Sequence, residues 1–175
     1  SRIQQEIFIA REQGSGTRAA TERFMDEKGI RLTTGTEMSK NESIKQAVRC
    51  GVEVIYHASF TDNEALDRME ANKDKVFVAP GLSVIFKLLY EGDAWGISRA
   101  RARELGYEEE LAAAVESMKQ MHRRGLRVLP GGDYGCAWAP HGTNAMDLQY
   151  FVKHCGMTPM DALLSATKYG GQIMM

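Results

Sequence analysis

Residues 41–60, NESIKQAVRCGVEVIYHASF, contain the pattern that decides the fold. Ile44, Ala47 and Val48 recur at helical spacing and predict an amphipathic helix that ends near the next glycine. VEVIYH (52–57) follows directly and is rich in the β-branched and aromatic residues typical of a strand. A helix that leads straight into a strand is half of a β–α–β unit, so this stretch predicts parallel β-structure.

The same alternation extends through the chain. Strand-like runs, each followed by a helical pattern, are predicted at residues 6–10, 32–38, 52–57, 75–80 and 126–133. About five strands alternating with helices predict an α/β fold, an open and mostly parallel sheet with helices on both faces. A complete eight-stranded barrel usually needs roughly 250 residues and more strands than these. No linker divides the chain, so we predict a single domain over residues 1–175.

Composition excludes several classes of protein. The chain is 43% hydrophobic and 26% charged, with a formal net charge of -1, which is typical of a globular protein. The charges are balanced and unclustered, so we expect no nucleic-acid surface. No apolar run approaches about 18 residues, so we expect no membrane span. Cys50, Cys136 and Cys155 form no C-x-x-C pair and are expected to be reduced, buried thiols. Without a signal-peptide pattern at the first residues, this favours the cytoplasm.

A glycine-rich turn lies between the first predicted strand and the first predicted helix. It consists of Gly14, Ser15, Gly16 and Thr17. Free amide groups at a helix start favour a bound anion, and the two hydroxyls can add donors. Two interpretations stay open, a small-anion site or a tight strand-to-helix turn capped by Ser15 or Thr17. The spacing matches neither of the common phosphate-binding glycine motifs.

The first third of the chain resembles a known family. FIAREQGSGTRAATERF (8–24) and TEMSKNESIKQAVRCG (36–51) resemble the effector-binding domain of LysR-type transcriptional regulators, over about residues 6–51. The resemblance implies part of the second lobe of a periplasmic-binding-protein-like fold, in which small effectors bind between two lobes. The first lobe and the winged helix-turn-helix have no match in these residues, so we do not expect a DNA-binding regulator.

The rest of the chain resembles a different family. GVEVIYHASFTDNEALDRMEANKDKVFVAPGLSV (51–84), PHGTN (140–144) and GMTPMDALLSATKYGG (156–171) resemble the C-terminal part of metal-dependent amidohydrolases. Imidazolonepropionase and Xaa-Pro dipeptidases are the members most similar to it. The resemblance covers about residues 43–175 and implies partial TIM-barrel units, about the last three strands of a barrel. In that family a divalent metal lowers the pKa of a bound water and polarises the scissile carbonyl.

The amidohydrolase resemblance also implies roles for individual residues. His57 matches the metal ligand after the sixth barrel strand, and Asp133 matches the ligand and general base after the eighth. His141 and Asn144 fall in the loop at which substrate would bind. The remaining ligands of the family have no match, because the four histidines include no H-x-H pair and none precedes His57. Since catalytic zinc typically keeps three protein ligands, we expect an incomplete remnant.

Structural roles are the alternative for the same side chains. His57 can act as a strand-end histidine, and Asp133 can brace the glycine-rich turn around it. His122 and His154 lie near predicted helix C-termini, where they are expected to interact with the helix dipole. We therefore expect no cofactor, with zinc or another divalent metal only if the amidohydrolase interpretation holds.

The two resemblances meet in one helix. IKQAVRCG (44–51) suits both families, and the chain changes from one to the other within a single helix–strand unit. This predicts an engineered or recombinant chimera without intact natural activity, LysR-like over 1–50 and amidohydrolase-like over 51–175. The alternatives are a metal-dependent amidohydrolase acting on amide or dipeptide bonds, or a small-anion-binding module. An exposed sheet edge left by missing barrel neighbours predicts a homodimer.

Overall fold

The protein alternates strands and helices in the order that the sequence predicts. The computed structural model describes residues 7–11, 16–30, 33–38, 40–131, 134–135 and 137–174. Side chains are described for residues 22–30, 41–131, 134–135 and 137–174. Over the described part of the chain, no helix has the length and apolar character needed to span a bilayer.

The first β–α–β unit forms a small sheet of its own. Strand β1 (Ile7–Arg11) is followed by helix α1 (Gly16–Glu27) and strand β2 (Thr33–Met38). The two strands pair in parallel, with a shift of register between Phe8 and Ile9. This is the connectivity that the sequence predicts for residues 6–38.

The second sheet holds the remaining strands. It consists of β3 (Val54–Tyr56), β4 (Phe77–Ala79) and β5 (Arg127–Val128), all parallel and in the order β3-β4-β5. This order is the one expected for consecutive strands of a barrel fragment.

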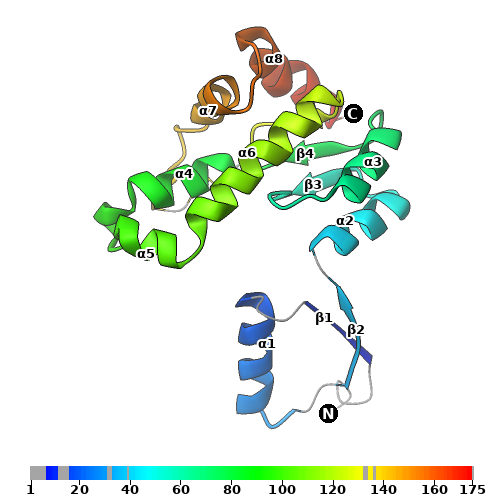
Figure 1. Cartoon of the computed structure of the whole chain (residues 1–175), viewed down its shortest axis with the longest axis vertical. Coiled ribbons are helices and arrows are strands. Elements are labelled where there is room, and N and C mark those ends of the chain that lie inside the picture. Colours follow the sequence, from blue (N-terminus) through cyan, green and yellow to red (C-terminus); the bar gives the residue numbers. More distant parts are fainter. Residues whose placement is uncertain are drawn as a thin grey trace.

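The prediction of one sheet of about five strands is wrong in one respect. The strands form two sheets, one of two strands and one of three. β1 and β2 satisfy each other's backbone groups. Helix α2 (Lys40–Arg49) links β2 to β3. It packs against the helix that follows β3, so β2 is not brought alongside β3 (Figure 1). The second sheet and the helices that pack on it are called the second unit below.

Helices make up most of the second unit (Figure 1). They are α3 (Asn63–Ala71), α4 (Leu82–Tyr90), the 3-10 helix η2 (Gly92–Trp95), α5 (Arg99–Glu104), α6 (Tyr107–Arg123), α7 (Met146–His154), α8 (Pro159–Leu164), the π-helix η3 (Ser165–Tyr169) and α9 (Gly170–Gln172). The predicted helices on both faces of the sheet are confirmed, because two separate apolar clusters form on it.

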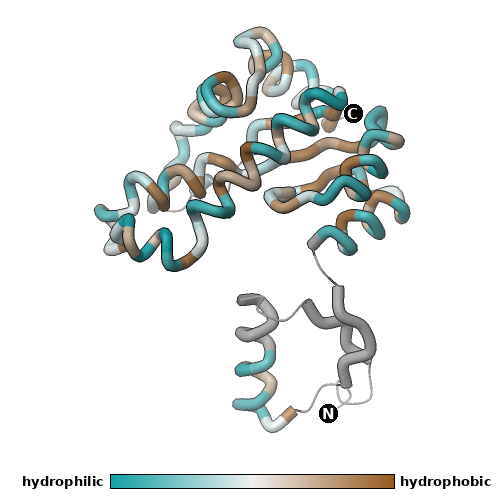
Figure 2. Tube along the Cα trace, viewed as in Figure 1, coloured by the Kyte–Doolittle hydropathy of each residue, from teal (hydrophilic) through white to brown (hydrophobic). Residues whose placement is uncertain are grey.

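The larger core lies on one face of the three-stranded sheet. Ile55, Val78 and Val128 contribute one buried residue from each strand. Successive strand residues point to opposite faces, so these three side chains share one face and meet the apolar sides of the helices. The helical residues buried with them include Leu66, Met69, Leu82, Met118, Met121 and Phe151. Figure 2 shows β4 as hydrophobic and α6 as a mixture of hydrophobic and hydrophilic residues.

The opposite face carries a smaller cluster. Phe77, Ala79 and Leu129 are buried there, and Tyr169 and Ile173 from the C-terminal helical segment pack against them. In a closed barrel this face would point inward, so the C-terminal segment covers only part of what a full barrel would enclose.

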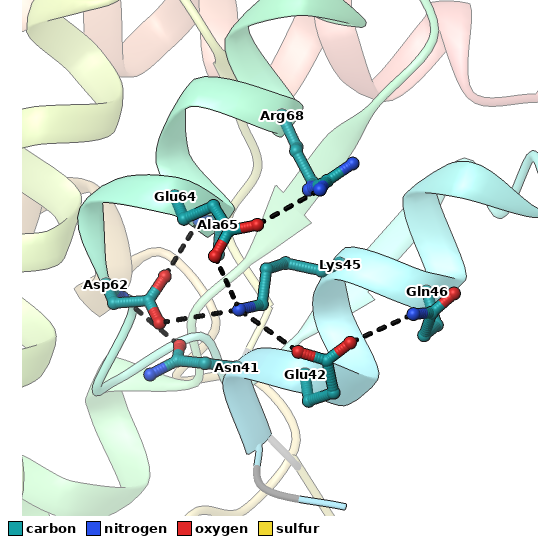
Figure 3. A network of polar contacts seen from close by, with 8 residues as sticks. All are labelled: Asn41, Glu42, Lys45, Gln46, Asp62, Glu64, Ala65 and Arg68. Atoms are coloured by element: carbon teal, nitrogen blue, oxygen red, sulfur yellow. Dashed lines mark hydrogen bonds and ion pairs between the residues drawn. The ribbon is translucent and has the colours of Figure 1, made fainter.

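Helix α2 is docked on α3 by both apolar and charged contacts. Val48 is buried, and Ile44 and Ala47 pack against the larger core. Lys45 is 12% exposed and makes ion pairs with Glu42 at 3.1 Å and with Glu64 at 2.9 Å (Figure 3). The helix shared by both resemblances is therefore structurally part of the second unit.

The N-termini of α3 and α8 are capped by side chains. At α8, Thr158 and Asp161 form a capping box, in which each side chain accepts a backbone N–H of the other residue. At α3, Asp62 is the N-cap residue and its Oδ1 accepts the backbone N–H of Ala65. The hydroxyl of the preceding Thr61 donates to the carbonyl oxygen of Ala58 at 2.8 Å.

The cysteines are partly as predicted. Cys155 is a buried free thiol, and burial raises its pKa to about 12. Cys50 is also a free thiol, but it is exposed because it follows the last turn of α2, so its predicted burial is wrong. Cys136 lies outside the described residues.

Candidate functional site

The carboxyl edge of the three-stranded sheet carries the predicted site. His57 follows β3, Gly81 follows β4 and Gly131 follows β5. The His57 N–H donates to the Ala79 carbonyl oxygen at 3.1 Å, and the Gly81 N–H donates to the Gly131 carbonyl oxygen at 2.7 Å. The loops after all three strands are therefore held together, at the edge where open α/β folds bind ligands.

His57 has an unusual backbone conformation. Its φ is 55°, the one positive value at a non-glycine residue in the described chain. The left-handed region costs an L-residue roughly 1–2 kcal/mol, and strain of this kind is concentrated at functional sites. The Ser59 N–H donates to the His57 carbonyl oxygen at 2.9 Å and closes this turn. The imidazole belongs to an exposed residue, so a ligand can reach it.

Asp133, the second predicted ligand, lies outside the described residues. Its nearest described neighbours are Gly131 and Tyr134. The structure therefore does not test the predicted pairing of His57 with Asp133. It does show β4 between β3 and β5, as expected for the sixth and eighth strands of a barrel.

The two predicted substrate-loop residues lie close to Tyr134 and Gly135. His141 lies against Gly135, where an added Cβ would come within 3.0 Å of its Nε2. Asn144 uses its Oδ1 to accept the N–H of Gly142 at 3.1 Å, and its carbonyl oxygen accepts the Tyr134 hydroxyl at 3.2 Å. These contacts shape the loop, and the role of either residue toward a substrate stays a prediction.

Asp147 is a site residue that the sequence prediction missed. Its side chain is fully buried at the start of α7. It accepts the N–H of Ser83 at 3.2 Å, the hydroxyl of Ser83 and the N–H of Gly131 at 3.0 Å. A signal was present, because Asp147 stands four residues before Phe151 and eight before Cys155, which places it on the buried face of the helix.

Tyr134 completes this polar cluster. Its hydroxyl lies 3.0 Å from the Ser83 hydroxyl. Burial, together with the nearby Asp147 carboxylate, raises the pKa of Tyr134 far above its ordinary value. The phenol therefore stays protonated at neutral pH and can donate to the Asn144 carbonyl oxygen.

The donor set does not fit a catalytic metal. Across the described residues, no group of three or more histidine, cysteine, aspartate or glutamate side chains is arranged to hold an ion. Two other histidines lie elsewhere. His122 is 3.6 Å from Asp161, and the His154 ring is tilted against Phe86 with ring centroids 4.8 Å apart. Both stand in the last turn of a helix, as predicted.

The predicted anion site is largely outside the described residues. Gly14 and Ser15 are not described, while Gly16 and Thr17 are the first residues of α1. The predicted strand before the turn and the predicted helix after it are confirmed, and the binding of an anion stays a prediction.

Comparisons with known proteins find relatives of both kinds. The HTH-type transcriptional regulator CbbR of Xanthobacter flavus is 29% identical over 142 residues, which is 79% of this chain and 38% of that protein. A "RuBisCO operon transcriptional regulator" of Allochromatium vinosum is 50% identical over 52 residues, which is 30% of this chain and 17% of that protein. The ochratoxinase of Aspergillus niger is 26% identical over 132 residues, which is 71% of this chain and 24% of that protein. No family model matches the chain.

Solved structures extend the second similarity. A Xaa-Pro dipeptidase crystallised with methionine in its active site aligns with a TM-score of 0.62 at 23% identity, covering 89% of this chain and 36% of its own. The ochratoxinase structure aligns with a TM-score of 0.58 at 22% identity, covering 75% and 28%. At this identity the likeness shows the fold alone.

The chain thus joins two segments of different parentage. One short segment is similar to LysR-type regulators, and most of the chain has the fold of the amidohydrolase and prolidase structures. The chain spans less than a fifth of that regulator and about a third of the dipeptidase.

Proposed function

We propose that the chain is a recombinant α/β protein that retains part of a metal-dependent hydrolase site and has no intact hydrolase activity within these 175 residues. The observation that carries this proposal is that no group of three or more metal-binding side chains is arranged to hold an ion among the described residues. His57 stands exposed after β3, at the carboxyl edge of the sheet. One histidine and one carboxylate would hold a metal too weakly to activate water, since catalytic zinc typically has three protein ligands.

Recombination is supported by the helix at the joint. α2 lies in the part of the chain that both resemblances share, residues 44–51, and it docks on α3 with a buried Val48 and a nearly buried Lys45. A helix whose apolar face suits both parent folds is a position at which a segment of one fold can be joined to a segment of the other without loss of packing. Parallel β–α units share handedness and similar strand–helix contacts, which makes such an exchange feasible.

The metal part of the proposal can be tested on the purified protein. Zinc is added in excess, the protein is passed through a desalting column, and retained zinc is measured for the native chain and for His57→Ala. We expect less than one retained equivalent in both, and no hydrolysis of Xaa-Pro dipeptides above background. His141→Ala is the matched control, since it removes an exposed histidine from the same end of the molecule.

The opposite result has a clear meaning. One full equivalent of zinc, lost in His57→Ala and kept in His141→Ala, together with dipeptide turnover by the native chain, would replace this proposal with the hydrolase interpretation. Any missing ligands would then come from Asp133 and a second copy.

We also propose self-association through the free edge of the three-stranded sheet. β3 is an edge strand, and Tyr56 within it is 66% exposed. Unpaired edge groups beside an exposed aromatic residue favour strand addition from a second copy. Sedimentation velocity at micromolar concentration should show a dimer that Tyr56→Lys weakens, and a monomer at every concentration would contradict the proposal.

A further inference from the structure

One buried carboxylate connects the elements around His57. Asp147 is 0% exposed and lies in the first turn of α7. Its Oδ1 accepts both the N–H and the hydroxyl of Ser83, and its Oδ2 accepts the Gly131 N–H at 3.0 Å. A single side chain therefore ties the start of α4 to the end of β5.

The start of α4 needs this carboxylate. Gly81 is the N-cap residue of α4, has a left-handed conformation with φ of 70° and offers no side chain for capping. The first N–H groups of a helix have no partner inside the helix, and a negative charge near them is favourable. Asp147 supplies from α7 the acceptor that the capping position itself lacks.

Gly81 is held from two sides by the same carboxylate. On one side Ser83, two residues later, donates to Asp147. On the other side the Gly81 N–H donates to the carbonyl oxygen of Gly131, whose own N–H donates to Asp147. The position of Gly81 therefore follows the position of the carboxylate.

Gly81 in turn lies directly against the His57 ring. A Cβ at position 81 would stand 2.8 Å from both Cε1 and Nδ1 of His57, which is closer than real contacts allow. The space for the imidazole on this side is thus set by the backbone of Gly81.

We propose that Asp147 is a positioning residue that fixes the orientation of the His57 imidazole through Gly131, Ser83 and Gly81. The proposal rests on the proposed function only in taking His57 as the surviving ligand. In metalloproteins, residues that hold a metal-binding histidine in place are important although they do not touch the metal. Their loss typically lowers metal affinity about 10–100-fold, and Asp147 would act on His57 in a comparable way, through backbone groups.

The test reads the ring itself and uses no metal. The Hε1–Cε1 signals of the four histidines are recorded by NMR for the native chain, Asp147→Asn and Asp161→Asn. Asp147→Asn replaces an oxygen acceptor by an N–H donor, so we expect the His57 signal to move toward that of a free histidine. Asp161→Asn makes the same change at the start of α8, beside His122, and is expected to move His122 while leaving His57 in place.

Two further measurements keep the proposal testable if Asp147→Asn does not fold. Ser83→Ala removes the hydroxyl donor but leaves both backbone donors to Asp147, so the His57 signal should stay where it is. The native chain should show a nuclear Overhauser effect between the His57 ring and the Gly81 Hα protons. The proposal is overturned by the absence of that effect, or by a His57 signal that stays fixed in folded Asp147→Asn. Because the NMR experiments use no metal, their outcome does not depend on the outcome of the zinc-retention experiment.

Discussion

The two β–α–β regions of this chain have the same connectivity, but their described side chains differ in burial. The region from β3 to α9 surrounds its sheet with two apolar clusters. In the region of β1, α1 and β2, none of the described side chains from residue 22 to residue 30 is buried, and Phe24 is 54% exposed. The difference teaches that the alternation of strand and helix is set locally, while a core requires neighbours on both sides of the sheet.

The helix that connects the two regions, α2, packs with the second region. α2 has a buried Val48 and a charged cluster that reaches Asp62, Glu64 and Arg68 (Figure 3). Both resemblances include residues 44–51 of this helix, but its tertiary contacts are with α3 and the larger core.

Substituting a phenylalanine in each region should give the largest contrast. Phe151→Ala removes a ring that is 0% exposed and should cost about 3–5 kcal/mol of unfolding free energy. Phe24→Ala removes a ring that is 54% exposed and should change stability by about 0.5 kcal/mol or less. Urea unfolding followed by circular dichroism measures both, and equal losses would mean that α1 is packed as α7 is.

The charged cluster at the joint should give an intermediate, pH-dependent effect. Hydrogen bonds from Gln46 and Lys45 lower the pKa of Glu42, and hydrogen bonds from Lys45 and Arg68 lower the pKa of Glu64. Carboxylates with a lowered folded-state pKa stabilise the protein above their unfolded pKa of about 4.3 and lose this effect as the pH falls further.

Lys45→Met should therefore reduce stability at pH 7 more than at pH 3, because the stabilisation by these carboxylates is progressively lost as the pH falls below about 4.3. Thermal melting at both pH values measures the difference, with Lys75→Met, at an exposed lysine outside the cluster, as the matched control. A loss of the same size at both pH values would assign the effect of Lys45 to packing of its aliphatic stem.

The backbone of His57 should give the smallest effect. Because its φ of 55° is a glycine-like conformation, His57→Gly should be more stable than His57→Ala by about 1 kcal/mol. Chemical denaturation of the two variants measures this value. Identical stabilities would indicate that the turn relaxes once the imidazole is gone.

The strands could be predicted closely from the sequence, but their pairing could not. VEVIYH and KVFVAP have the composition and length of strands, and β3 and β4 lie inside these stretches. Which strands become neighbours depends on edges and on the packing of connecting helices. Helix α2 has an apolar stripe that suits either parent, so the pattern of residues 44–48 does not reveal that it packs on α3.

The candidate site was predicted in part for a similar reason. His57 was found through its resemblance to a ligand at a strand end, and its exposure at the sheet edge agrees with that position. Asp147 was missed because a carboxylate in the first turn of a helix is usually a solvated charge. Its burial depends on Ser83 and Gly131, which are 64 and 16 residues away in the chain.

Native-state hydrogen exchange followed by NMR tests the division into two unlike regions most directly. The account predicts that amides of β4 and α6 exchange through global unfolding, while those of α1 exchange through openings of much lower free energy. Protection of α1 equal to that of α6 would contradict it, because the two regions would then share one cooperative core.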